Sequence, residues 1–265
     1  MRNYAEAKKL FEDRLDASAY FDSISAEVTR KKLTDSIKDA QNNLTFLLGK
    51  SGQGKSFLIN YLYTTLSSEL FFVLISHPVS SEHELLTLLY KKLSNSDTSN
   101  YDLSDLRDAV LDLYDSKKHI IFIDEAQILD IELLERIRIL SDSKSLRFVL
   151  VMHEDEGEEI LSKPHFKTRR KRTIHLHNLH TNEVERYIQQ IFVANAQGDI
   201  GSMFVSKYTE QISKLCGGNF RYIKRLVYTI LELLEYAKEE GIVRYQNLNS
   251  CILTMAALDI GLIDE

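Results

Sequence analysis

The feature that most constrains the fold of this chain is the string GKSGQGKS at residues 49–56. It matches the pattern G-x-x-x-x-G-K-[ST] at every fixed position. Glycines at these positions let backbone N–H groups turn inward around a phosphate, and a following helix points its positive end at the same anion. The apolar run Leu44–Leu48 precedes the string, and Phe57–Leu66 follows it with helical spacing. The string therefore predicts a phosphate-binding loop between a strand and a helix.

Two residues of this loop have distinct chemical roles. The Lys55 ammonium can reach the β- and γ-phosphates of a nucleotide, and the Ser56 hydroxyl can ligate Mg²⁺. The sequence thus predicts ATP and Mg²⁺ as cofactors. The residues predicted to bind the nucleotide are Gly49, Lys50, Ser51, Gly52, Gln53, Gly54, Lys55, Ser56 and Phe57.

A second apolar run, His119–Ile123, ends in two acids, Asp124 and Glu125. This is the Walker B arrangement, in which Asp124 would complete the Mg²⁺ site with Ser56. Glu125 would polarise the attacking water. A second carboxylate is not needed to hold the metal, so its presence favours hydrolysis over binding alone.

The remaining apolar runs complete the fold prediction. Short buried runs that alternate with helices, here also Leu70–Ile75 and Leu146–Met152, indicate a parallel sheet covered on both faces. An apparent strand, Thr173–Leu176, directly follows Arg172, and after about residue 178 only helical patterns remain, of which the first spans Thr181–Ala194. We therefore predict an α/β P-loop NTPase fold, a parallel sheet sandwiched by helices, with a small C-terminal all-helical lid. The expected domains are an N-terminal helical segment (1–40), the P-loop α/β ATPase core (41–177), and the lid with the C-terminal helices (178–265).

Composition excludes several other classes of protein. The chain is 44% apolar, with 2 Pro and 10 Gly among 265 residues, which rules out disordered and collagen-like chains. Two cysteines rule out a disulfide framework and suit a reducing compartment. No stretch approaches the length of about 18 apolar residues needed to span a bilayer, and the N-terminus lacks the apolar region of a signal peptide. A cytoplasmic protein without a membrane span is expected.

The formal net charge of -6 conceals an uneven distribution. Residues 101–160 hold 16 Asp and Glu against 7 Lys and Arg, whereas residues 163–225 hold 12 Lys and Arg against 4 Asp and Glu. The first segment is therefore strongly acidic and the second strongly basic.

The phosphate loop, the IIFIDEAQ string at 120–127 and the helical lid together resemble AAA+ ATPases. More specifically, the chain resembles the ExeA or general secretion pathway protein A type, which includes pilus-biogenesis relatives and is akin to transposition ATPases of the TnsC type. Further similar strings are Ala19–Phe21, the strand and turn at 74–80 with His77 in place of Asn, and residues 134–141, which resemble the family's LE-x-LR-x-L string. The resemblance covers about residues 19–235.

The resemblance implies three more site residues. His153 follows the predicted strand Leu146–Met152 at the sensor 1 position, where it would touch the γ-phosphate or orient the water; a plain strand-end histidine is the alternative. Arg172, or else Arg169, would be the arginine finger that acts on a neighbouring subunit's nucleotide. Arg221 would be the sensor 2 residue of the lid, preceded by Phe220 where the family has Pro.

The function implied is an ATP-hydrolysing oligomeric switch or remodeller in secretion or pilus-type envelope assembly. The expected partners are further copies of the chain, and an inner-membrane assembly protein that recruits it. The acidic and basic segments would face each other across the interface between copies. The alternative is an ATP-dependent DNA-binding regulator in transposition or DNA loading, with the basic run Lys167–Arg172 on the DNA backbone. A third reading, a nucleotide-binding scaffold that hydrolyses little, is disfavoured by Glu125.

Two sets of residues are not assigned to a site. His175 and His177 would share a strand face, but no cysteine or nearby acid is expected to complete a metal site with them. They are predicted to be solvated. Cys216 and Cys251 are predicted to be small buried helix residues and not a redox pair.

Overall fold

The computed structural model describes residues 2–12, 21–39, 41–66, 71–77, 79–94, 101–115, 119–143, 145–167 and 172–264. The chain forms two compact units, which we describe separately. The α/β unit comprises the described residues within 26–51 and 55–176. The helical unit comprises those within 1–25, 52–54 and 177–265.

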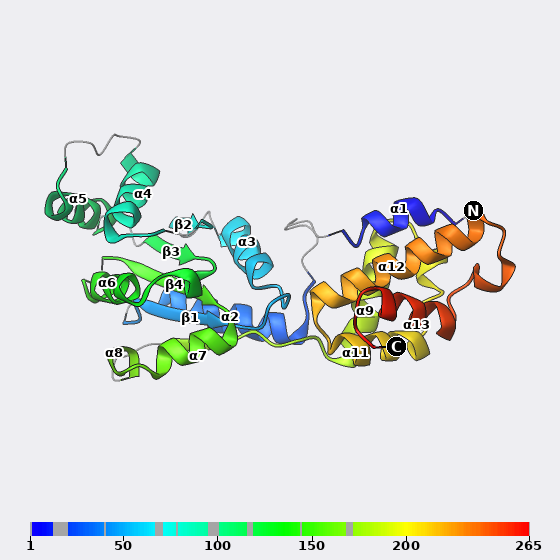
Figure 1. The fold of residues 1–265 in the computed structure, drawn as a ribbon. Coiled ribbons are helices and arrows are strands. Elements are labelled where there is room, and N and C mark those ends of the chain that lie inside the picture. Colours follow the sequence, from blue (N-terminus) through cyan, green and yellow to red (C-terminus); the bar gives the residue numbers. More distant parts are fainter. Residues whose placement is uncertain are drawn as a thin grey trace. The chain divides into compact units, whose positions relative to one another are not determined.

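The α/β unit is built on a five-stranded sheet in the order β2-β3-β4-β1-β5 (Figure 1). All four pairings between neighbouring strands are parallel, which confirms the predicted parallel sheet. Parallel strands need crossover connections, and helices supply them here. The strands are β1 (Leu44–Leu48), β2 (Phe71–Ile75), β3 (His119–Ile123), β4 (Arg147–Met152) and β5 (Arg172–His175).

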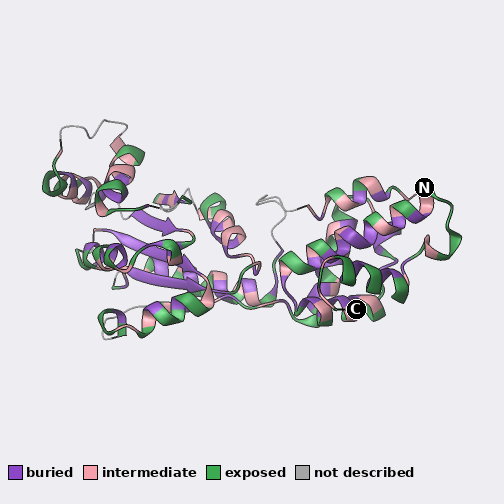
Figure 2. Ribbon diagram, viewed as in Figure 1, coloured by how far each residue is buried: buried purple, intermediate pink, exposed green. Residues whose placement is uncertain are grey.

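Every residue of β1, β3 and β4 is buried (Figure 2). Such strands read as continuous apolar runs because both faces of the sheet are covered. For this reason β1 and β3 have the predicted bounds. Strand β4 begins one residue later than predicted, and β5 begins and ends one residue earlier than predicted.

Helices pack on both faces of the sheet. On one face, alternate residues of β1, Leu44, Phe46 and Leu48, join a core with side chains from α4, α5, α6 and α7. On the other face, Tyr63 of α3 lies against Phe72 of β2, which lies against Phe122 of β3. The helical elements that lie wholly or mostly in this unit are α2 (Ile24–Lys38), α3 (Lys55–Leu66), α4 (Glu82–Ser94), α5 (Leu103–Asp115), η2 (Ala126–Ile128), α6 (Ile131–Asp142), α7 (Glu154–Ser162) and α8 (Pro164–Lys167).

The helical unit has a core of its own, and its longest helix, α12 (Phe220–Glu239), runs through it. The N-terminal helix α1 (Tyr4–Lys9) belongs to this unit, since Tyr4 and Ala7 enter that core and Lys8 pairs with Glu235 at 2.6 Å. The other elements are α9 (Thr181–Ala194), α10 (Gly198–Gly201), α11 (Ser206–Cys216), η3 (Val243–Tyr245) and α13 (Ser250–Asp259).

The two cysteines differ in their surroundings. Cys216, the last residue of α11, is buried as predicted. The prediction is wrong for Cys251, which is exposed because it lies on the outer side of α13, whose inner side buries Ile252, Leu253 and Ala256. Among the described helices, none is both long and apolar enough to cross a membrane.

Candidate nucleotide-binding site

The first part of the phosphate loop follows β1 and leads into α3. Lys55 is the first residue of α3, and its side chain is buried. Its Nζ donates hydrogen bonds to the carbonyl oxygens of Gly49, at 2.7 Å, and Lys50, at 3.1 Å. The ammonium is thereby held over the start of the loop, where phosphate oxygens of a nucleotide could replace these carbonyls as acceptors.

The middle of the loop, Gly52–Gly54, groups with the helical unit. Gly52 has a φ of 78° and Gly54 a φ of 94°, the left-handed region that favours glycine. A Cβ on Gly52 would also lie 2.5 Å from the Oδ1 of Asn219, the residue that caps α12. In the same unit, the Arg221 backbone N donates to the Gly52 carbonyl at 3.2 Å. Glycine at position 52 is thus required by both its conformation and its neighbours.

The two predicted metal ligands lie side by side in the α/β unit. The Ser56 Oγ donates to the Asp124 Oδ2 at 2.7 Å. Asp124 is itself fixed, because its backbone N donates to the Ile75 carbonyl at 3.0 Å and its Oδ1 accepts from the Glu125 backbone N at 3.0 Å. A hydroxyl and a carboxylate oxygen at this separation suit Mg²⁺, which takes few protein oxygens and keeps several waters.

Glu125 lies next to the metal ligands in an uncommon backbone conformation, with φ 52° and ψ 36°. Two groups approach the same carboxylate oxygen, Oε2: the Gln127 Nε2 donates to it, and the His153 Nε2 lies 3.5 Å away. The Gln127 Oε1 accepts a hydrogen bond of 3.3 Å from the His153 backbone N. The structure thus places His153, the predicted sensor 1 residue, beside Glu125, and adds Gln127, to which we assigned no role from the sequence.

The other predicted residues have the following places. Arg172 is exposed and is the first residue of β5, within the strand and not before it as predicted. Arg221 is exposed at the second position of α12, in the helical unit. The Gln53 side chain donates to the Asn178 Oδ1 at 2.9 Å. Arg169 lies outside the described residues.

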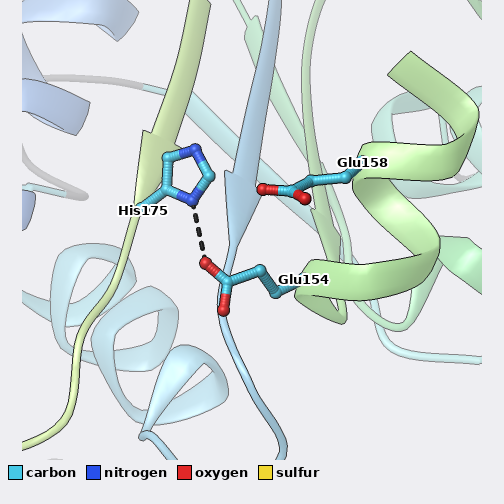
Figure 3. A group of neighbouring side chains, drawn as sticks. All are labelled: Glu154, Glu158 and His175. Atoms are coloured by element: carbon cyan, nitrogen blue, oxygen red, sulfur yellow. Dashed lines mark hydrogen bonds and ion pairs between the residues drawn. The ribbon is translucent and has the colours of Figure 1, made fainter. Parts of the chain in front are cut away.

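The histidine pair requires a correction. His175 ends β5 and has acids nearby, contrary to the prediction: its Nδ1 lies 3.1 Å from the Glu154 Oε1 (Figure 3). Glu158, one helical turn further along α7, brings a second carboxylate to the same group, and the three ligand atoms all lie within 4.8 Å of one another. His177 lies beyond the end of the strand. The sequence did not predict these acids, because α7 and β5 are separate segments of the chain that come together only in the folded structure.

Comparison with known proteins agrees with this geometry. Residues 38–161 match the family model described as AAA domain. General secretion pathway protein A of Aeromonas hydrophila is 26% identical over 198 residues, which is 70% of this chain and 35% of that protein. The chain therefore spans about a third of the length of this curated relative.

Solved structures show the same fold. Cdc6p from Pyrobaculum aerophilum superposes with a TM-score of 0.62 at 14% identity, over 88% of this chain and 66% of that one. The ORC1 protein of Aeropyrum pernix in complex with DNA gives 0.59 at 14% identity, over 96% and 69%. The RuvB Holliday junction branch migration motor of Thermotoga maritima gives 0.52 at 18% identity, over 88% and 68%. The chain has the P-loop fold of AAA+ ATPases.

Proposed function

We propose that the chain binds ATP with Mg²⁺ and hydrolyses it, and the match of residues 38–161 to the AAA domain family model supports this proposal. The observation that carries the proposal is the 2.7 Å contact between Ser56 and Asp124, since it joins the phosphate loop to the acidic end of β3. Ser56 and Asp124 would hold Mg²⁺ there, and the ion would neutralise charge that develops on the phosphates.

The residues of the chain have separable tasks in this reaction. Lys55 exchanges its carbonyl partners, Gly49 and Lys50, for phosphate oxygens and holds the nucleotide by charge. Glu125 orients a water and accepts its proton as the water oxygen bonds to the γ-phosphorus. The bond from that phosphorus to its bridging oxygen breaks, and ADP leaves with the electron pair.

We further propose that the chain works as an oligomer. In this arrangement a neighbouring copy supplies Arg172 or Arg169 to the γ-phosphoryl group, because a guanidinium is well suited to stabilise charge spread over phosphate oxygens. The exposure of Arg172 is consistent with that task. The similarity to general secretion pathway protein A supports a role in secretion or pilus-type envelope assembly, with an inner-membrane assembly protein as a partner.

An ATPase assay on three proteins tests the enzymatic part. Lys55→Ala is expected to abolish nucleotide binding, whereas Glu125→Gln is expected to bind ATP, turn over at least about 100-fold more slowly and accumulate as an oligomer. Turnover at the wild-type rate in either variant would contradict the site assignment. If the wild-type protein hydrolyses no ATP with or without added DNA, the enzymatic function itself is wrong.

A second candidate function is ATP-dependent binding to DNA. Two of the structural neighbours are a protein in complex with DNA and a branch migration motor, and the segment 163–225 of this chain is strongly basic. Backbone contacts to DNA release counterions, so affinity that needs ATP and falls steeply with salt would support this function. No measurable binding to a duplex at low salt, with ATP present, would eliminate it.

A further inference from the structure

Gln127 lies two residues after Glu125, in η2, and makes two contacts with opposite ends of its side-chain amide. The Nε2 donates to the Glu125 Oε2, and the Oε1 accepts from the backbone N of His153 at 3.3 Å. The first contact is to the end of β3 and the second is to the end of β4. One amide therefore ties the Glu125 carboxylate to the neighbouring strand.

The chemistry of the two contacts requires an amide at this position. The His153 backbone N is a donor and must meet an oxygen, whereas the carboxylate accepts and must meet a donor. A carboxylate at position 127 would satisfy His153 and repel Glu125. A thioether would satisfy neither. Of the side chains of this length, glutamine alone offers both an acceptor and a donor in a planar group.

We propose that Gln127 is a positioning residue for Glu125, an inference that rests on the proposed ATPase function. The Gln127 amide and the His153 ring both approach Oε2. Among the contacts of the described residues, none falls on the Glu125 Oε1. The Gln127 amide thus holds one carboxylate oxygen, and about half of the Glu125 side chain is exposed, so that a water can reach the carboxylate and give up its proton there.

The unusual backbone of Glu125 makes this support necessary. A non-glycine residue at φ 52° is held in this conformation by its surroundings. The side-chain oxygens of Asp124 already accept from Ser56 and from the Glu125 backbone N. Without Gln127 the Glu125 carboxylate would keep the His153 ring at 3.5 Å but lose its hydrogen-bond donor, and it would meet the water less often.

The test compares Gln127→Met and Gln127→Glu with the wild-type protein by steady-state ATP hydrolysis. We expect both variants to lower kcat by about 10- to 100-fold, the range seen when supporting partners of catalytic ligands are removed, and to leave KM within about twofold. A nucleotide-binding measurement should give wild-type affinity. Gln190→Met makes the same chemical change at an exposed position of α9 and should have wild-type kcat.

The Gln127→Glu variant separates positioning from a merely structural role. If Gln127 only fastened η2 to β4, Glu at this position would keep the bond from the His153 backbone N and hydrolysis would be normal. Normal or faster hydrolysis by either variant overturns the proposal while the ATPase function stands. A wild-type protein without ATPase activity overturns both, and a raised KM with unchanged kcat assigns Gln127 to ATP binding instead.

Discussion

Gly218 connects α11 to α12 at a place where the backbone leaves no room for a side chain. It has a φ of 72°, and a Cβ there would overlap the carbonyl oxygen of Leu179. The two residues are also bonded, since the Leu179 N donates to the Gly218 carbonyl at 2.9 Å. Gly241 has nearly the same φ, 69°, but open space around it. Substitutions at these two glycines therefore separate the cost of a left-handed conformation, which both share, from the cost of steric overlap, which arises at Gly218.

Gly218→Ala should therefore destabilise the protein more than Gly241→Ala does. A left-handed alanine costs about 1 kcal/mol, which both variants incur, and overlap with a fixed backbone adds roughly 2 kcal/mol at position 218 only. Urea unfolding followed by circular dichroism measures both. Equal losses in the two variants would show that the Leu179 backbone moves away freely.

Cysteine reactivity offers a second prediction. Burial raises the pKa of the Cys216 thiol to about 12, and because the thiolate is the reactive form, this thiol stays inert at pH 8. Cys251 is exposed. Iodoacetamide should label one cysteine per native chain, and Cys251→Ser should abolish the labelling. Mass spectrometry counts the adducts; labelling of native Cys251→Ser protein would contradict the burial of Cys216.

The sequence pointed to some residues of the candidate site and not to others. Lys55, Ser56 and Asp124 could be proposed because the phosphate-loop pattern and the acid after an apolar strand carry their chemistry in a few adjacent positions. Gln127 could not, because its proposed role depends on the His153 backbone, 26 residues away, at the end of another strand. The Glu154 and Glu158 carboxylates were missed beside His175 for the same reason.

Among the secondary-structure elements, those with a regular pattern of apolar residues were predicted most closely. Strands β1 and β3 are apolar from end to end, and α9 has both a regular apolar spacing and a capping box formed by His180 and Glu183. Their observed bounds equal the predicted ones. Strand β4 begins at Arg147, one residue later than predicted, because the buried Leu146 before it lengthens the apolar run without belonging to the strand.

The buried Arg147 side chain makes a hydrogen bond to another element. Its Nη1 donates at 2.6 Å to the Ile37 carbonyl in the last turn of α2, a group that no helical N–H can satisfy. Burial lowers the pKa of Arg147, and the nearby Asp39 acts in the opposite direction. The charged side chain thus fixes the end of α2 to the start of β4.

We therefore expect Arg147→Met to lower the free energy of unfolding by about 1 to 3 kcal/mol, the usual cost of leaving a buried polar group without its partner. Arg136→Met is the matched control. Arg136 is exposed and lies 3.8 Å from Glu82, which keeps its 2.6 Å pair with Arg107 in the variant, so we expect a loss of less than about 1 kcal/mol. Chemical denaturation of the two variants tests the comparison. A loss as small in Arg147→Met as in Arg136→Met would show that water satisfies the Ile37 carbonyl.

For the chain as a whole, the fold class was predicted correctly and the distribution of charge remains the informative feature. The acidic segment 101–160 lies within the α/β unit and contains Asp124 and Glu125. The basic segment 163–225 contains the proposed finger residues and Arg221. A net charge of -6 spread evenly would oppose association between copies, whereas separated segments of opposite sign favour it.

This asymmetry predicts a salt-sensitive oligomer. Glu125→Gln protein with ATP and Mg²⁺ should sediment as an oligomer at about 50 mM salt and dissociate near 500 mM, since the Debye length falls well below about 10 Å over that range. Bound nucleotide, measured at both concentrations, must stay constant, so that loss of ATP does not account for the change. An oligomer of unchanged size at the higher salt would show that apolar contacts hold the copies together, and the charge complementarity proposed between the two segments would be wrong.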